Sequence, residues 1–171
     1  MSGLPSITPR ARVYVRILAT GKCYNRSMSL TPRAILSNQN VRSALQQAWT
    51  DSNSGVNGGH EEGGFIVKDN ADNLSIIRWP KGLKDNIQVP PHRDSSFDGL
   101  EILASFHTHP NTGSDYLQEP SETDKRAVRD DPDLKGAGYV GEFVISQAII
   151  YLISPAVQVR DMDDTQVVFT D

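Results

Sequence analysis

Cysteine is almost absent from this sequence, since Cys23 is the only one among 171 residues. A single thiol cannot form an intramolecular disulfide or supply a cysteine-based zinc site. Long apolar runs are missing too: the longest, Ala148 to Ile153, is far too short to cross a bilayer. Met1 to Arg12 contains no apolar stretch of signal-peptide length. We therefore expect a soluble, cytoplasmic protein with no membrane partner.

An excess of positive charge is also lacking. The formal net charge is −4, and no basic cluster stands out, which argues against nucleic-acid binding. The contents of hydrophobic residues, 37%, and charged residues, 22%, are ordinary for a globular protein. The length suits one domain with an extension. We expect an N-terminal extension, residues 1–58, to pack one strand and one helix on a core formed by residues 59–171.

Within the extension, two segments have recognisable periodicity. Arg12 to Leu18 alternates charged and apolar residues, which predicts a strand with one wet face. Asn40 to Asp51 carries apolar residues at spacings of three and four, which predicts an amphipathic helix capped by Ser37 or Asn38.

The remainder of the chain mixes strands with one helix. A turn at residues 69–73 separates two apolar segments and predicts a hairpin. The fold class is therefore a mixed α/β or α+β domain. The expected hairpin strands are Gly64–Lys68 and Leu74–Trp79, the further strands are Leu100–Phe106, Gly141–Ile145 and Ala148–Ile153, and the helix is Ser121–Arg129.

Three other features receive structural predictions. The acidic run Asp161 to Asp164 is expected to be a solvated turn, since nothing near it suggests a cation site. His92, in Pro-Pro-His-Arg, is expected in an exposed loop. Trp79 is expected to anchor the core.

The segment that carries chemistry is His107-Thr108-His109-Pro110, followed by Ser121 and Asp124. Residues two apart on a strand point to the same side, so both imidazoles can reach one ion. Two histidines and a carboxylate leave a ligand position open for water, as catalytic zinc sites do. Each piece also has a purely structural interpretation: Pro110 ends a strand, Ser121 caps a helix and Asp124 is a first-turn acid.

The same residues resemble a family signature. His107-x-His109-Pro110, ten intervening residues, then Ser121-x-x-Asp124 is similar to the motif of JAMM metallopeptidases with the MPN (JAB) domain. The upstream segment Glu61-Glu62-Gly63-Gly64-Phe65 resembles the family's early strand with its glutamate. The resemblance runs to about Ile153 and extends to the closing strands of bacterial members. It implies a cytidine-deaminase-like fold, with a curved, mostly antiparallel sheet flanked by helices.

The resemblance also implies roles for individual residues. His107, His109 and Asp124 would bind Zn²⁺, and Glu61 would take a proton from the attacking water and deliver it to the leaving amine. Ser121 would donate to the oxyanion. The implied reaction is hydrolysis of a peptide or isopeptide bond in a protein or peptide substrate, for example at the C-terminus of a ubiquitin-like protein.

Two points depart from the family pattern or leave a choice open. The interval 111–120 is longer than the family usually has, which can reshape the substrate entrance. Glu61 and Glu62 compete for the role of base, and on a strand they face opposite sides. The family spacing favours Glu61.

His60 is expected at a loop or edge, facing away from Glu61.

Two rival functions remain open at this stage. The first is a non-catalytic MPN-like scaffold or binding module, although such a protein has no reason to keep Glu61 together with the histidines, Ser121 and Asp124. The second is a different hydrolase on the same fold, for example in a toxin or defence locus. The sequence does not determine the oligomeric state.

Overall fold

The computed structural model describes residues 30–55 and 58–170. The predicted strand Arg12–Leu18 lies outside these residues. Four helices and seven strands are present in the described part of the chain. In chain order they are α1 (Pro32–Leu36), α2 (Gln39–Asp51), β1 (Gly63–Lys68), β2 (Leu74–Arg78), β3 (Ser96–Phe97), β4 (Leu100–Thr108), α3 (Glu122–Asp130), β5 (Glu142–Ile145), β6 (Ile149–Ile153), β7 (Val159–Asp164) and α4 (Thr165–Thr170).

The strands form one open sheet in the order β2-β1-β4-β5-β6-β7, and β3 pairs with β4 beside this path. Every pairing is antiparallel except that of β4 with β5. Parallel neighbours require a crossover connection, and the segment between β4 and β5 contains α3. The prediction of a mixed α+β domain with a mostly antiparallel sheet is therefore confirmed.

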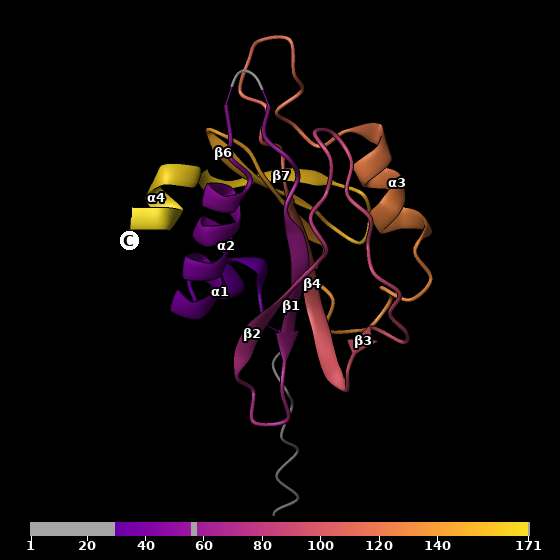
Figure 1. The fold of residues 1–171 in the computed structure, drawn as a ribbon. Helices are drawn as coiled ribbons and strands as arrows, with labels where there is room; N and C mark the ends of the chain where they lie inside the picture. The colour runs from indigo at the N-terminus through magenta and orange to yellow at the C-terminus, as the bar shows by residue number, and fades with distance from the viewer. Residues whose placement is uncertain (1–29, 56–57, 171) are drawn as a thin grey trace, which may run out of the picture.

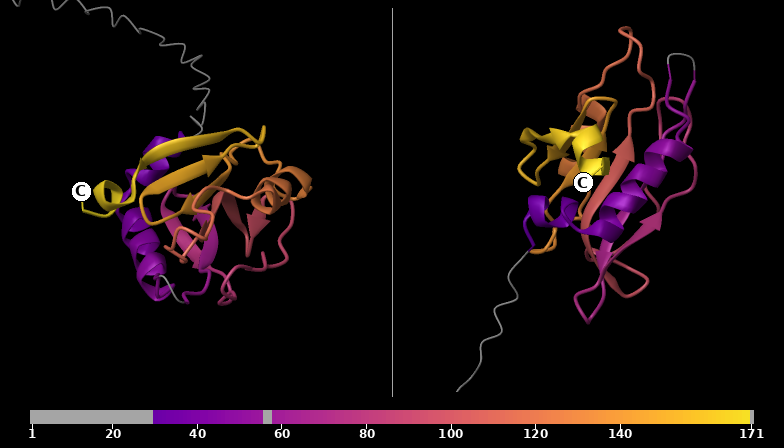
Figure 2. Two further views of the ribbon diagram at one scale, coloured as in Figure 1. Left: turned by 90° about the horizontal axis from the view of Figure 1, so that it is seen from above. Right: turned by 90° about the vertical axis from the view of Figure 1, so that its left-hand side faces the viewer.

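Helices cover both faces of the sheet. Figure 1 shows α1, α2 and α4 on one side and α3 on the other, and the view from above in Figure 2 agrees. We call these sides the α2 face and the α3 face. Buried side chains of the α2 face include Val41, Leu45, Ile66, Phe106 and Phe143. Those of the α3 face include Phe65, Val67, Trp79, Val128 and Val144.

Helix α2 forms where the apolar spacing predicted it. Asn38 caps it, because the side-chain oxygen accepts hydrogen bonds from the backbone N–H groups of Asn40 and Val41. Its apolar stripe places Val41 and Leu45 in the α2-face core, fully buried. Burial of such side chains stabilises by roughly 1.5–3 kcal/mol each. The helices before residue 58 thus share a core with the sheet.

The hairpin and the other predicted strands are also confirmed. β1 and β2 pair in register from Gly64 with Arg78 to Lys68 with Leu74. The Asp69 carboxylate closes the turn by accepting from the backbone N–H groups of Ala71 and Asn73. Trp79 is buried as predicted.

Two predictions are wrong. Asp161 to Asp164 do not form a turn but belong to β7, which pairs with β6 at the edge of the sheet. Charged side chains suit an exposed edge, where they discourage pairing with a second chain. His92 is not an exposed loop residue either: its side chain is largely buried, with its ring 5.1 Å from that of Phe65. Of the described helices, none has the length and apolarity that a bilayer crossing requires.

Candidate metal centre

The two histidines lie at the end of β4, between two other strands. β4 pairs with β1 on one side and with β5 on the other, and His107 is opposite Val144 in the parallel register. His109 follows the strand, and its backbone N–H donates to the carbonyl of Ile145 at 2.8 Å. Strand alternation turns Phe106 and Thr108 to the α2 face and both histidines to the α3 face. The imidazoles therefore stand beside each other, with Nε2 atoms 3.1 Å apart.

Asp124 reaches the histidines from the first turn of α3. Ser121 and Asp124 form a capping box: the Ser121 hydroxyl accepts from the Asp124 backbone N–H, and the Asp124 carboxylate accepts from the Ser121 N–H at 2.6 Å. The same carboxylate lies 3.6 Å from Nε2 of His107 and 3.4 Å from Nε2 of His109. The capping box thus fixes the carboxylate that faces the imidazoles.

These three side chains fit one metal ion. Ligand atoms about 2.0–2.1 Å from a tetrahedral ion stand about 3.3–3.4 Å from one another. The two Nε2 atoms are 3.1 Å apart, and Oδ2 of Asp124 lies 3.4 Å from Nε2 of His109, both close to that value. The other oxygen of Asp124, Oδ1, lies 3.6 Å from Nε2 of His107. One ligand atom from each of the three residues lies within 4.8 Å of the other two. Among the described residues, His107, His109 and Asp124 are the group of acidic, histidine or cysteine side chains that can hold a metal ion.

A fourth residue, Glu142, orients His107 from behind. Its carboxylate lies 3.0 Å from Nδ1 of His107, and both residues are buried. A carboxylate partner on the remote nitrogen fixes the tautomer that leaves Nε2 free for a metal. Sequence reasoning assigned no role to Glu142. The available signal was a charged residue at the start of the apolar strand Glu142-Phe143-Val144-Ile145.

The charges of this cluster act on one another through its buried surroundings. Burial alone lowers the pKa of His107, but the carboxylates of Glu142, Asp124 and Glu61 outweigh it and raise the pKa to about 9. For Asp124, burial favours the neutral form, yet contacts with His109, His107 and Ser121 hold the pKa of the carboxyl well below its usual range.

Glu61 and Glu62 separate as strand alternation requires. Glu61 lines the same cavity as the histidines and Asp124. Burial raises the pKa of its carboxyl, and the two histidines only partly offset this. Glu62 faces the α2 side instead, where it contacts His60 and Arg78. The structure therefore brings Glu61, and not Glu62, to the candidate metal centre.

The remaining expected residues also take definite places. Ser121 lines the cavity, and because its oxygen accepts from Asp124, its hydroxyl hydrogen remains available to donate. His60 turns away from the cavity toward Glu62, as predicted. Trp79, besides packing in the core, forms part of the cavity wall.

The cavity has a volume of about 360 Å³ and opens between two loops. One is the 80–95 segment and the other is the long interval 111–120. The loops are joined by Lys84, whose ammonium donates to the Tyr116 hydroxyl at 2.6 Å and whose carbonyl accepts from the Asn111 side chain. Two apolar side chains that line the cavity, Leu117 and Val89, are partly open to solvent, and Leu117 is the more exposed of the two.

Comparisons with known proteins add no relative: no family model, no curated protein and no solved structure matches this chain.

Proposed function

We propose that this protein is a zinc-dependent hydrolase that cleaves an amide bond, either a peptide or an isopeptide bond, in the manner of JAMM metallopeptidases. One observation carries the proposal. Two imidazoles and a carboxylate lie close enough together to hold one metal ion, and a buried glutamate lines the same cavity. This set of donors leaves a ligand position open, which distinguishes catalytic zinc sites from structural ones.

Zinc is the metal we propose, because two imidazole nitrogens and one carboxylate oxygen form catalytic zinc sites and the family that the sequence resembles uses zinc. When bound, zinc supplies a Lewis acid that polarises a carbonyl and makes water acidic near neutral pH. Glu142 and the Ser121–Asp124 capping box hold two of the ligands in place before the ion arrives. Such preorganisation supports tight binding.

Glu61 is the proposed general base and acid. A base works best when its pKa lies near the working pH, and burial moves the pKa of the Glu61 carboxyl upward from its usual value. It accepts a proton from the attacking water and passes it to the leaving nitrogen. Ser121 is the proposed donor to the oxyanion of the tetrahedral intermediate, a contact typically worth about 3–4 kcal/mol in the transition state.

The surroundings of the cavity support a polypeptide as the substrate. The cavity opens at the surface between two loops, and Leu117 at its mouth is 60% exposed. An extended chain can cover such apolar side chains while its scissile bond reaches the metal. The family resemblance makes the C-terminus of a ubiquitin-like protein the first substrate to examine.

The first experiment is elemental analysis of the purified protein and of the double variant His107→Ala/His109→Ala. About one zinc ion per wild-type chain, lost in the double variant, would support the centre. Absence of zinc from the wild type even after incubation with it would refute the proposal and leave the scaffold interpretation ahead.

The second experiment separates binding from catalysis. We expect Glu61→Gln to retain zinc and to abolish hydrolysis of fluorogenic amides on ubiquitin-like C-termini and on a peptide panel. Glu101→Gln is the matched control, because Glu101 lies outside the cavity on β4 and pairs with Lys68. Full activity in Glu61→Gln would show that another group acts as the base.

A further inference from the structure

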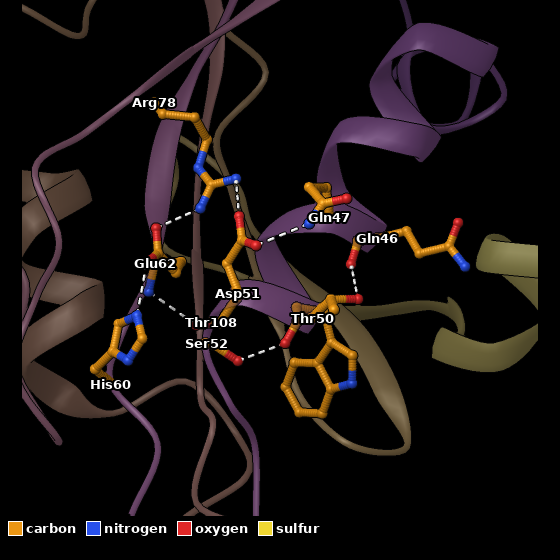
Figure 3. Close-up of polar contacts among 10 residues, drawn as sticks. Gln46, Gln47, Thr50, Asp51, Ser52, His60, Glu62, Arg78 and Thr108 are labelled. Carbon is orange, nitrogen blue, oxygen red and sulfur yellow. Dashed lines mark hydrogen bonds and ion pairs between the residues drawn. The ribbon is translucent and has the colours of Figure 1, made fainter.

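The polar cluster behind Glu61 is extensive, although it does not line the cavity. It lies on the α2 face, where His60, Glu62 and Arg78 come together with Asp51 of α2 (Figure 3). Glu62 is 8% exposed, and ionised side chains are rarely buried to that extent without partners. Its position next to Glu61 gives the cluster a direct mechanical link to the proposed base.

The first link is to the histidine motif itself. Thr108 lies between the two proposed zinc ligands and turns its side chain to the opposite face of β4. Its hydroxyl oxygen accepts from the Glu62 backbone N–H at 3.0 Å, and its own N–H donates to the Glu62 carbonyl at 2.9 Å. Two bonds between the same pair of residues fix the register of the Glu61–Glu62 segment against His107 and His109.

The second link is to helix α2 through the Glu62 side chain. One carboxylate oxygen of Glu62 lies 2.7 Å from Nε2 of His60, and the other accepts from the Arg78 guanidinium. Arg78 also donates to Asp51 at 3.3 Å, and Asp51 accepts from Gln47 at 2.8 Å, as Figure 3 shows. The chain of contacts ties Glu62 to β2 and to the last turns of α2.

The third link holds the opposite side of the segment. The Glu61 backbone N–H donates to the Leu83 carbonyl at 2.7 Å, and the Glu61 carbonyl accepts from the Gly82 N–H at 2.9 Å. Glu61 therefore has backbone partners on the loop side, while Glu62 has them on the β4 side. These backbone bonds hold the segment in place on both sides. The Glu62 side chain, anchored on the opposite face, adds the contacts that direct the Glu61 side chain toward the cavity.

We infer that Glu62 and Thr108 are positioning residues for Glu61: Thr108 sets its register against the zinc ligands, and Glu62, held by Arg78 and His60, keeps the segment from rotating. This inference rests on the proposed function, since it takes Glu61 as the base. Displacement of a reacting group by about 1 Å can cost about 100-fold in rate. Loss of either residue therefore lowers kcat while the ligands and the substrate surface stay intact.

Thr108→Val is the sharpest test, because valine has nearly the same shape and removes only the hydroxyl. We expect the zinc content and KM to stay at wild-type values, kcat to fall about 10–100-fold, and Thr108→Ser to restore kcat. Thr165→Val is the matched control: Thr165 is equally buried and its hydroxyl donates to the Ser146 carbonyl at 3.0 Å, away from Glu61. It should lower stability and leave kcat unchanged.

A second measurement makes the inference testable without turnover. In the crystal structure of zinc-loaded Glu62→Ala we expect the Glu61 carboxylate to leave the cavity, and in Thr108→Val we expect faster exchange of the Glu62 amide proton. If the wild type binds zinc but cleaves no amide, the proposed function fails. The position of the Glu61 carboxylate in the Glu62→Ala crystal structure still tests this inference. A Glu61 carboxylate that stays in the cavity of Glu62→Ala, or an unchanged kcat in Thr108→Val, would overturn it.

Discussion

Replacement of Glu142 by glutamine should change zinc affinity in a way that depends strongly on pH. The substitution keeps the size of the side chain and an oxygen that can accept from Nδ1 of His107, but it removes the negative charge. That charge has two effects on zinc binding. It orients His107 and strengthens it as a ligand. It also stabilises the protonated form of His107, whose proton zinc must displace in order to bind.

The two effects can be weighed against each other. With a pKa of about 9, His107 carries a proton at pH 7 in the metal-free protein. Because this pKa lies about two units above pH 7, competition with the proton weakens zinc binding about 100-fold at pH 7, or by about 2.7 kcal/mol. In Glu142→Gln the pKa of His107 falls, so this competition shrinks. Against that gain stands the loss of the carboxylate partner, which typically costs about 10–100-fold in metal affinity.

The expected result follows from their opposite dependence on pH. Near pH 7 the gain and the loss nearly cancel, and the variant binds zinc about as tightly as the wild type. At pH 9.5 and above, most of the proton competition is gone in both proteins, and the variant binds about 10–100-fold more weakly. Wild-type affinity should rise by about tenfold per pH unit between pH 7 and 9 as His107 loses its proton.

Competition with a chromogenic zinc chelator, at buffered free zinc from pH 6.5 to 9.5, measures this dependence. Glu101→Gln, the same substitution outside the cavity, is the control and should follow the wild-type curve. An affinity ratio between wild type and Glu142→Gln that is constant across this range would refute the reasoning.

Three further predictions concern stability and the ligand set. In the metal-free protein, the raised pKa of His107 contributes stability that is fully present below pH 6.5 and is lost as the pH rises through about 9. At about 1.4 kcal/mol per pKa unit, the loss in the free energy of unfolding is about 3 kcal/mol. Urea unfolding at each pH measures it. No fall in metal-free stability over that range would contradict it. Asp124→Asn should keep the capping contact with an amide oxygen, fold normally and lose zinc on dialysis; retained zinc would remove Asp124 from the ligands. Gly64→Ala should destabilise the fold by about 1–3 kcal/mol, because the new methyl group would lie 2.6 Å from the Phe106 ring and 2.7 Å from a carbonyl oxygen of β2. In the control Gly55→Ala the methyl group meets open space, so thermal melting followed by circular dichroism should match that of the wild type.

The parts of the fold that the sequence predicts are those with a local period. Helix α2 shows its apolar spacing within thirteen residues and carries its own cap at Asn38. The β1–β2 hairpin is closed by a turn that Asp69 stabilises from within. In each case the pattern and the structure it specifies occupy the same short stretch of chain, so no distant partner is needed to interpret it.

The features that sequence reasoning missed depend on partners far along the chain. Glu142 gains its role because β5 lies parallel to β4 and its carboxylate meets His107, 35 positions earlier. β7 carries acidic residues that look like a turn, and only its pairing with β6 makes it a strand. His92 becomes buried because Phe65 lies beside it. Neither the parallel pairing nor these packing contacts follow from any local period.

The choice between Glu61 and Glu62 lies between these extremes. Alternation alone predicts that the two carboxylates face opposite sides, but it does not say which side holds the metal. The paired hydrogen bonds of Glu62 with Thr108 supply the missing reference. Thr108 must face away from the site, because His107 and His109 face it. Glu62 is bonded to Thr108 and faces the same side, so its neighbour Glu61 faces the histidines. A register slip of one residue in β1 would exchange Glu61 for Glu62 in the cavity and would break both bonds at once. The bonds that keep the strand in place are therefore also the ones that select Glu61 for the candidate centre.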